Sequence, residues 1–324
     1  MNAYQLWNED CVQGMPHRLD ADAVDLVVTS IPFGALFAYS AKTEDIGNNP
    51  DGTDMRASMF GLHMRFFVEQ LVRVMKPGTI AAIHIQQLLT TKVQHGYMGR
   101  RDFRGAVVDL FAAADLVWRG EICIPKNPQV IAQRTGLHSL KFETGRKDGR
   151  RLAPYVNDFV MIFQKPGEAV PVPCLYDLAR NPGGWVTTAE WIRDAHGVWT
   201  DIRETDVLQD GQDQQSRAKA ARVAAGREEE DERHVCPLQL EVIRRLVKLY
   251  SNPGETVFDP FMGIGSTGYV ALEQGRLTRG FELKSSYFEI AIKNCQRALE
   301  SRQREVMPPE EMPMLAAIER ASVA

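Results

Sequence analysis

Short, fully apolar runs alternate with longer runs at helical spacing along most of this chain. VDLVVTS, at 24–30, and TIAAIHI, at 79–85, have the continuous apolar character of buried strands. Between them, FGLHMRFFVEQLVRVMK repeats apolar residues along one helical face and ends at Pro77-Gly78, which predicts a helix over 60–76. The same reasoning predicts a helix at 103–114 and strands at 116–124 and 158–163.

Strands that alternate with helices predict an α/β fold with a doubly wound, mainly parallel sheet. The pattern stops over 168–233, which contains several prolines, three tryptophans and an acidic block. It resumes over 234–305 with a helix, a strand, a glycine-containing loop, a second helix and a second strand. We therefore expect one sheet domain made of 1–167 and 234–305, an inserted recognition region at 168–233, and a peripheral tail at 306–324.

Composition narrows the class of protein. The 324 residues are 44% hydrophobic and 25% charged, which is typical of a globular protein. The sequence has no run of about 18 apolar residues and no secretory signal, so a cytoplasmic protein without membrane spans is predicted. The five cysteines are scattered and never spaced C-x-x-C, which favours reduced thiols and no metal site.

A glycine-containing loop between two strands indicates a nucleotide-type binding site. A strand ends at Asp259, Gly263 and Gly265 follow, and the next strand closes on Glu282. The glycines let the backbone approach a ligand, and an acid at the second strand's end can bind two ribose hydroxyls. A plain tight turn is the alternative. Because Asp259 inside the loop suits a sulfonium better than a pyrophosphate, S-adenosylmethionine is favoured over NAD(P).

Three segments together resemble the DNA amino-methyltransferases. DPFMGIGSTGYVALEQGRLTRGFEL, from Asp259, resembles their S-adenosylmethionine-binding segment, D-P-F-x-G-x-G-T. HVCPLQLEVIRRLVKLYSNPG, from His234, resembles the helix that precedes it, and TSIPF, at 29–33, resembles the catalytic tetrapeptide (D/N/S)-P-P-(Y/F/W). The catalytic segment comes first, which is the circularly permuted order called the β class.

The resemblance, which covers about 1–167 and 234–295, implies a Rossmann-like methyltransferase fold with S-adenosylmethionine as cofactor and double-stranded DNA as substrate. It makes 1–167 the catalytic half, 168–233 the target-recognition region and 234–305 the cofactor half. A homodimer is expected by analogy with β-class enzymes alone.

The resemblance assigns catalysis to Ser30, Ile31, Pro32 and Phe33. The exocyclic amine of a base is conjugated with its ring and is a poor nucleophile. The Ser30 side chain and the Ile31 carbonyl would accept its N–H bonds, and Phe33, expected as an exposed ring, would stack on the flipped base. Because positioning and electrostatics suffice, no strong base is required. Ile31 replaces the family's first proline, which keeps the carbonyl but loses the rigidity of the turn.

The resemblance gives several further residues a cofactor role. Asp10 would lie near the adenine, although it also fits an exposed acid before a helix. Phe261 would line the pocket or belong to the core. Ser266 and Thr267 would donate to the cofactor carboxylate or cap a helix. The remaining members of the motifs are His234, which also fits a helix cap, Pro237 and Pro260.

DNA contacts must come from local basic clusters because the net charge is −4. One cluster lies at 133–151, and a second at 97–104 adds Arg104 to its members. A solvated basic surface is the alternative for each residue. The expected DNA-binding residues are Arg100, Arg101, Arg134, Lys141, Arg146, Lys147, Arg150 and Arg151.

Several rival functions account for fewer of these features. An NAD-dependent dehydrogenase gives TSIPF no role, and a cytosine-C5 methyltransferase needs a nucleophilic cysteine that Pro173-Cys174 does not convincingly supply. Protein or RNA amine methyltransferases usually have the opposite motif order. A degenerate site that only binds DNA remains an alternative because of Ile31. For the base, we favour adenine-N6, the commoner bacterial mark, whereas serine at position 30 is typical of cytosine-N4 enzymes.

Overall fold

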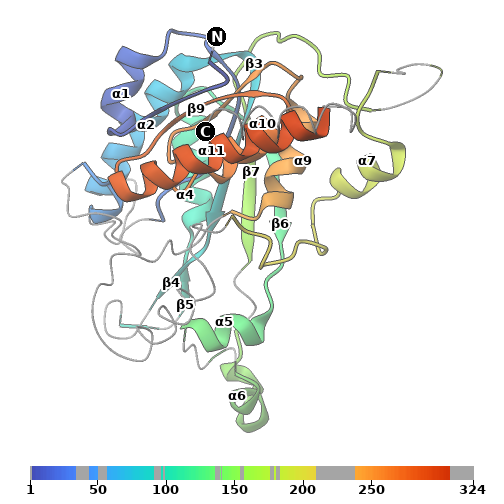
Figure 1. The fold of residues 1–324 in the computed structure, drawn as a ribbon. Coiled ribbons are helices and arrows are strands. Elements are labelled where there is room, and N and C mark those ends of the chain that lie inside the picture. Colours follow the sequence, from blue (N-terminus) through green and yellow to red (C-terminus); the bar gives the residue numbers. More distant parts are fainter. Residues whose placement is uncertain are drawn as a thin grey trace, which may run out of the picture.

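A seven-stranded sheet in the order β1-β9-β8-β2-β3-β7-β6 forms the centre of the molecule (Figure 1). In that order, the strands are Tyr4–Trp7, Leu277–Phe281, Thr256–Asp259, Val24–Ser30, Met75–Gln86, Asp158–Gln164 and Val117–Ile124. β7 is antiparallel to both of its neighbours, and all other pairs are parallel. This computed structural model describes residues 2–33, 44–49, 57–90, 96–97, 99–135, 139, 141–153, 157–175, 179, 183–208 and 238–306.

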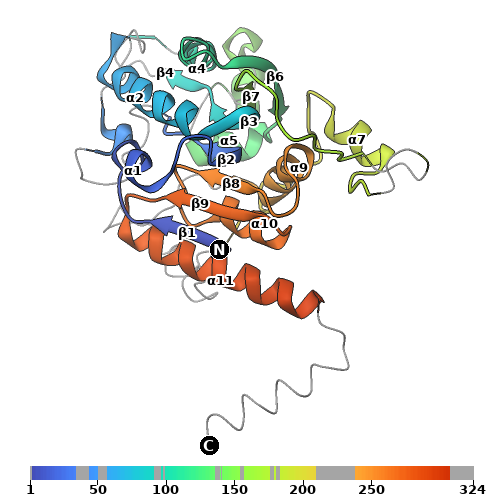
Figure 2. The same cartoon turned by 90° about the horizontal axis from the view of Figure 1, so that it is seen from above.

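Helices cover both faces of the sheet, as the doubly wound prediction requires (Figure 2). One core contains Phe67 and Leu71 of α2 together with apolar residues of α1 and α4. The other contains Ile243 of α9, Val270 of α10 and Tyr287 of α11. The bounds are Cys11–Arg18 for α1, Met59–Val74 for α2, Phe103–Ala112 for α4, Leu240–Tyr250 for α9, Ser266–Glu273 for α10 and Ser285–Val306 for α11.

The winding direction reverses between β2 and β8. β2 leads through α2 to β3 on one side, whereas β8 leads through α10 to β9 on the other. Doubly wound sheets bind ligands beyond the carboxyl ends of the strands at such a reversal. Ser30 and Asp259, the last residues of β2 and β8, therefore lie at the edge where a ligand is expected.

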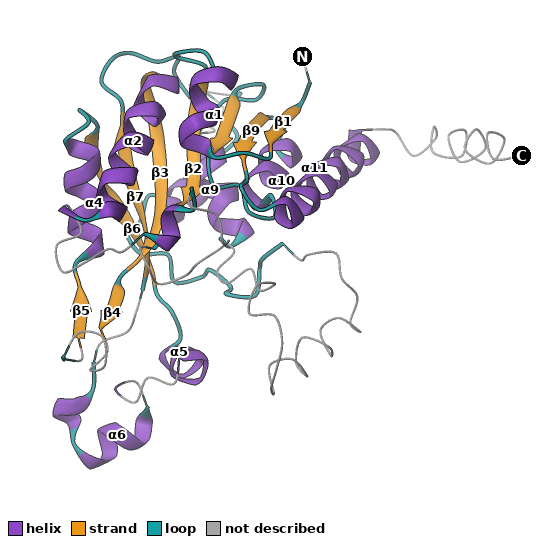
Figure 3. Cartoon of the chain, turned by 90° about the vertical axis from the view of Figure 1, so that its left-hand side faces the viewer, coloured by secondary structure: helices purple, strands orange, loops and turns teal. Residues whose placement is uncertain are grey.

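Smaller elements lie beyond the lower end of the sheet in Figure 1. β4 (Leu88–Thr90) and β5 (Gly99–Arg101) form a two-stranded antiparallel sheet. α5 (Pro128–Thr135) follows β6, and α6 (Phe142–Lys147) and the short 3-10 helix Gly149–Arg151 come next in the chain. Figure 3 shows α5 and α6 at the same end of the molecule as the β4–β5 pair.

Part of the region expected as an insert belongs to the main sheet domain. Trp199 is 1% exposed and packs in the core with Ile243. Backbone hydrogen bonds join Cys123 N to Gly197 O and Trp199 N to Cys123 O, both at 2.9 Å, along the free edge of β6. Trp199 therefore belongs to the core of the main sheet domain. α7 (Thr188–Asp194) precedes this contact and carries a complete capping box.

Arg245 fastens this segment to α9. Its guanidinium is 3% exposed and donates to both carboxylate oxygens of Asp201 at 3.0 and 2.6 Å. It also donates to Glu241 at 3.0 Å, lies 3.3 Å from buried Asp194, and sits 5.0 Å from the centroid of the Trp199 ring. Removal of a buried cation with this many partners strongly destabilises a protein, because the partner carboxylates then lack a counterion.

We predict that Arg245→Met lowers the free energy of unfolding by about 3 kcal/mol, because Asp194 stays buried after it loses its ionic contact with Arg245. Arg244→Met is the matched control: Arg244 is one residue away and pairs with half-exposed Glu273 at 3.2 Å. That loss should stay below about 1 kcal/mol. Urea unfolding of both variants measures the difference, and equal losses would show that Arg245 acts as an ordinary surface ion pair.

Candidate active site

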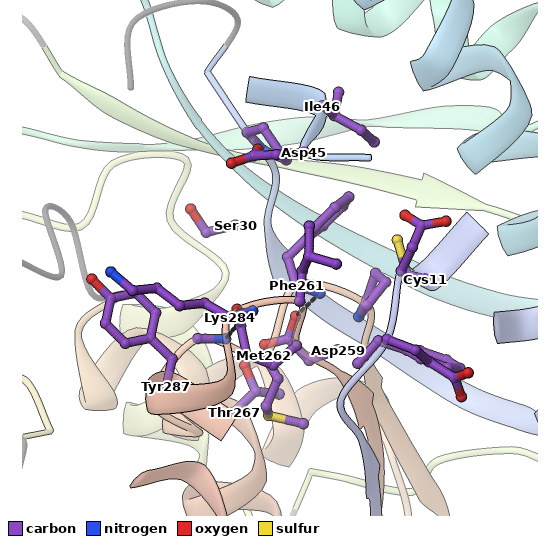
Figure 4. A pocket seen from close by; sticks show the side chains of 18 of the residues that line it. Cys11, Ser30, Asp45, Ile46, Asp259, Phe261, Met262, Thr267, Lys284 and Tyr287 are labelled. Atoms are coloured by element: carbon purple, nitrogen blue, oxygen red, sulfur yellow. Dashed lines mark hydrogen bonds between the residues drawn. The ribbon is translucent and has the colours of Figure 1, made fainter. Parts of the chain in front are cut away.

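A pocket opens at the carboxyl ends of β8 and β2, where the winding reverses. Ser30 and Pro32 line it together with eight of the eleven expected cofactor residues. Figure 4 shows Asp45 and Ile46 on one side of the pocket and Met262 and Thr267 on the other. The expected cofactor residues that line it are Asp10, Asp259, Pro260, Phe261, Gly263, Ser266, Thr267 and Glu282.

Asp259 ties three elements together at the base of the pocket. Its Oδ1 accepts from Thr29 Oγ1 on β2 at 2.6 Å and from Phe261 N at 3.0 Å. The Thr267 hydroxyl on α10 also faces this carboxylate and favours its ionised form. Burial raises the pKa of Asp259 to about 6, although these hydrogen bonds oppose the shift. Asp259 thus has a structural role in addition to any contact with a ligand.

Glu282 is held by the glycine loop that faces it. Its Oε2 accepts from Gly263 N at 2.8 Å, and its Oε1 accepts from Lys284 N at 2.8 Å. Burial raises the pKa of Glu282 to about 7, and the nearby charges of Asp259 and Asp45 add to the effect. Each carboxylate oxygen has further lone pairs, so Glu282 can still accept from two ligand hydroxyls.

The two glycines of the loop have positive φ angles, which residues with side chains rarely adopt. Gly263 has φ of +54° and Gly265 has φ of +89°. A Cβ at Gly265 would also lie 3.0 Å from Ala291 Cα on α11. Gly265 does not line the pocket; it is the N-cap of α10 and brings the helix N-terminus to the cavity. Because Gly265 holds the N-cap position, neither Ser266 nor Thr267 caps α10, and Thr267 instead donates to Val28 O at 3.2 Å.

Asp10 lies both at the start of α1 and in the wall of the pocket. Its Oδ2 accepts from Gln13 N at 2.8 Å, so it caps α1, and it also lines the pocket. Burial raises the pKa of Asp10.

Three of the expected site residues are not described. They are His234, Pro237 and the side chain of Arg134, which lie outside the part of the chain that the structure describes.

The catalytic segment divides between the pocket and the core. Ser30 and Pro32 line the pocket, whereas the side chains of Ile31 and Phe33 are each 1% exposed. The Phe33 ring makes edge contacts with His84, 5.9 Å between ring centroids, and with Phe103, at 6.4 Å. The expectation of an exposed Phe33 ring is therefore wrong, because α4 and β3 supply aromatic neighbours that cover it. Stacking of Phe33 on a base remains a prediction.

The pocket is strongly acidic. Glu9, Glu44 and Asp45 join Asp10, Asp259 and Glu282 around it, and Lys284 is the basic residue among the lining groups. The Lys284 ammonium lies 4.5 Å from the centroid of the Tyr287 ring, which also lines the pocket. Sequence reasoning missed these residues; Lys284 and Tyr287 could have been suspected from their place directly after Glu282.

The geometry agrees with an independent comparison with known families. The model of the N6/N4 DNA methylase family matches residues 24–293. The chain belongs to this family. The match includes the catalytic segment, the glycine loop and Glu282, and the family depends on S-adenosylmethionine.

Curated relatives resemble this chain over limited stretches. The type II methyltransferase M.BglI of Bacillus subtilis is 28% identical over 148 residues, which are 46% of this chain and 33% of that protein. The DNA adenine methyltransferase YhdJ of Escherichia coli is 35% identical over 70 residues, 22% of this chain and 24% of that protein. The chain thus spans about a third or less of the curated relatives it matches.

Solved structures match the chain over nearly its whole length. A proposed DNA modification methylase from Thermus thermophilus, in complex with S-adenosyl-L-methionine, has a TM-score of 0.62 at 17% identity, covering 91% of this chain and 94% of that one. The cytosine-N4-specific PvuII DNA methyltransferase has a TM-score of 0.53 at 14% identity, covering 92% and 95%. At these identities the likeness establishes the fold, and the expected Rossmann-like methyltransferase fold is confirmed.

The expected DNA-binding residues lie apart from the pocket. Arg100 and Arg101 lie on β5, Lys141 precedes α6, and the other described members are on α6 and the turn after it. The Arg150 and Arg151 side chains are 92% and 74% exposed, although both pair with Asp148. Arg104 of the second cluster instead pairs with Glu121 and sits 5.4 Å from the centroid of the Trp118 ring, so it holds α4 to β6.

The described residues contain neither a membrane-spanning helix nor a metal-binding cluster. None of the described helices is long and apolar enough to cross a membrane. Across the same residues, no three His, Cys, Asp or Glu side chains are grouped in a way that would hold a metal ion.

We predict that the raised pKa of Glu282 makes the free protein more stable at lower pH. Because its folded pKa is above the unfolded value, its contribution is full at low pH and is lost as pH rises through about 7. Lowering the pH from 8 to 6 should raise the free energy of unfolding by about 1 kcal/mol through this group.

Glu282→Gln should remove that pH dependence, and Glu300→Gln, at an exposed position on α11, should leave it. Chemical unfolding at several pH values measures both variants. A wild-type stability that falls between pH 8 and 6 would contradict the assignment.

Proposed function

We propose that this chain transfers a methyl group from S-adenosylmethionine to the exocyclic amine of a base in double-stranded DNA, with adenine-N6 as the target. The observation that carries the proposal is the shared pocket: Ser30 and Pro32 of the catalytic segment line the same cavity as Asp259 and Glu282. We also propose the permuted β-class order, with 1–167 as the catalytic half, 168–233 as the target-recognition region and 234–305 as the cofactor half.

The residues of the pocket fit the cofactor. Six carboxylates around one cavity favour a ligand that carries positive charge and disfavour a pyrophosphate. Glu282 would accept from the ribose hydroxyls, Asp10 would lie by the adenine, and the loop at Gly263 would allow close approach. When bound, S-adenosylmethionine supplies an electrophilic methyl group on a sulfonium.

The catalytic segment prepares the amine for attack. Ser30 lies where its hydroxyl oxygen, together with the Ile31 carbonyl, would accept the two N–H bonds of the amine. This draws the nitrogen lone pair out of conjugation with the ring and towards the methyl group. Phe33 would reach the base only after its cover by Phe103 and His84 opens, so stacking requires a local rearrangement.

The basic residues beyond the pocket would hold the DNA backbone. β5, α6 and the turn after α6 lie at one end of the molecule, beyond the carboxyl ends of the central parallel strands (Figure 3). Exposed arginines such as Arg150 suit phosphate contacts, which give affinity without sequence preference. A homodimer remains a prediction by analogy.

The second candidate is cytosine-N4 methylation, which Ser30 favours. The two products can be told apart after incubating the protein with S-adenosylmethionine and unmethylated genomic DNA. Digestion to nucleosides and mass spectrometry should detect N6-methyladenine, and Ser30→Ala should abolish it. Detection of N4-methylcytosine would select the second candidate. The absence of both products would contradict the proposed function.

We predict that replacing Arg146, Lys147 and Arg150 by Gln together weakens DNA binding. Losing up to three phosphate contacts should lower the slope of log affinity against log salt by up to about 3. The control replaces Lys293, Arg297 and Arg302 on α11 by Gln, at the β1 side of the sheet (Figure 2). Fluorescence anisotropy at several salt concentrations measures both, and equal slopes in the two triple variants would place the DNA elsewhere.

A further inference from the structure

A row of polar side chains crosses the sheet behind Ser30. The Ser30 hydroxyl lies 2.9 Å from His84 Nδ1, and His84 Nε2 lies 3.2 Å from Asp158 Oδ2. Lys126 Nζ lies 2.6 Å from the same Asp158 oxygen, and Gln86 donates to the other one at 3.2 Å. The row therefore leads from the wall of the pocket into the interior.

The register of four strands creates this row. Ser30 of β2 is the direct partner of His84 of β3, and Gln86 of β3 is the partner of Asp158 of β7. Asp158 pairs in turn with Ile124, the last residue of β6, and Lys126 follows two residues later. Since side chains two residues apart share a face, Ser30, His84, Asp158 and Lys126 point to the same side of the sheet.

The row is buried and charged. The side chains of His84, Asp158 and Lys126 are 4%, 8% and 8% exposed. Burial alone would raise the pKa of Asp158, but the hydrogen bond and charge of His84, with Lys126, outweigh it and lower the pKa. The Nε2 atom of His84 is the ring nitrogen nearest to Asp158, and Nδ1 faces Ser30. The groups that face His84 are thus Ser30, Asp158, Lys126 behind Asp158, and the Phe33 ring.

We propose that His84 is the proton acceptor for the Ser30 hydroxyl during methyl transfer, and that Asp158 and Lys126 set its basicity. The inference rests on the proposed function, in which Ser30 accepts an N–H bond of the amine. A neutral serine is a weak acceptor for the proton that the amine must lose. His84, with Asp158 behind it, gives Ser30 a route to pass that proton on.

The proton moves between the side chains in two steps. Before reaction, Ser30 O–H donates to His84 Nδ1, which leaves the Oγ lone pairs for the amine, and His84 carries its own proton on Nε2. As the nitrogen gains the methyl group, one of its N–H bonds breaks and that proton goes to Ser30 Oγ. The original Ser30 proton moves to His84 Nδ1, so an imidazolium forms next to the Asp158 carboxylate and later releases its proton to solvent.

If the row had only a structural role, different experimental results would be expected. Buried polar groups at a sheet face also occur as satisfied networks that only fix the packing. Such a network would affect stability when altered, but it would not make the rate of methyl transfer depend on the charge state of His84. The pH profile of the chemical step therefore separates the two roles.

The first experiment measures single-turnover methyl transfer against pH, with S-adenosylmethionine and DNA both saturating so that titration of the pocket acids does not enter. In the wild type, the rate should fall at acid pH, because the proposed role needs a ring nitrogen that is free to accept the proton. His84→Asn keeps a polar group near Ser30 but cannot take up the proton. It should slow transfer about 100-fold and remove the acid limb, with cofactor affinity little changed.

Substitutions of Asp158 and Lys126, the two residues behind His84, should shift the pH profile of the rate in opposite directions. Asp158→Asn removes the charge that stabilises the imidazolium, so the acid limb should move to lower pH and the rate should fall. Lys126→Met removes an opposing positive charge, so the limb should move to higher pH. His17→Asn, at an exposed position on α1, is the control and should match the wild type. Shifts of the same sign, or none, would overturn the inference.

The second experiment needs no catalysis. NMR of 15N-histidine-labelled protein at neutral pH should show His84 with its proton on Nε2 and Nδ1 as the acceptor, and Ser30→Ala should shift the Nδ1 signal. A proton on Nδ1 would overturn the inference even where methyl transfer is normal. Failure of the wild type to methylate DNA would instead overturn the proposed function, and with it the role of His84.

Discussion

A buried hydrogen bond between Thr29 and Asp259 holds the two functional halves together. It joins the ends of β2 and β8 at 2.6 Å across a separation of 230 residues in the chain. Through Phe261 N, the same carboxylate also fixes the loop after β8. The catalytic segment and the cofactor loop therefore share one cavity because Asp259 contacts both, and its high degree of burial is the condition for that geometry.

Patterns within a short stretch of chain predicted most of the fold. The strands of VDLVVTS and TIAAIHI, the helix at α2 and the β8–α10–β9 unit all have local signals, and each is present. β1, with four residues, is too short to show alternation, and it exists because it pairs with β9. The edge contact of Trp199 with β6 is likewise a tertiary contact that no local pattern reports.

The site was predictable only where it is contiguous in sequence. The segments around Asp259 and Glu282 carry their own motif, and most of their expected residues line the pocket. The cover of Phe33 by Phe103 and the row through His84 and Asp158 depend on strand register, so residues far apart in the chain must meet before either can be seen.

The ring of carboxylates around the pocket has a consequence for the end of each turnover. Burial and the repulsion of the neighbouring acids Asp259 and Asp45 raise the pKa of Glu282, although Lys284 also lines the pocket. A sulfonium relieves this repulsion, but the thioether left after methyl transfer is neutral and does not. The electrostatic attraction thus disappears with the methyl group, and the same carboxylates that favour binding of the donor favour departure of the spent product.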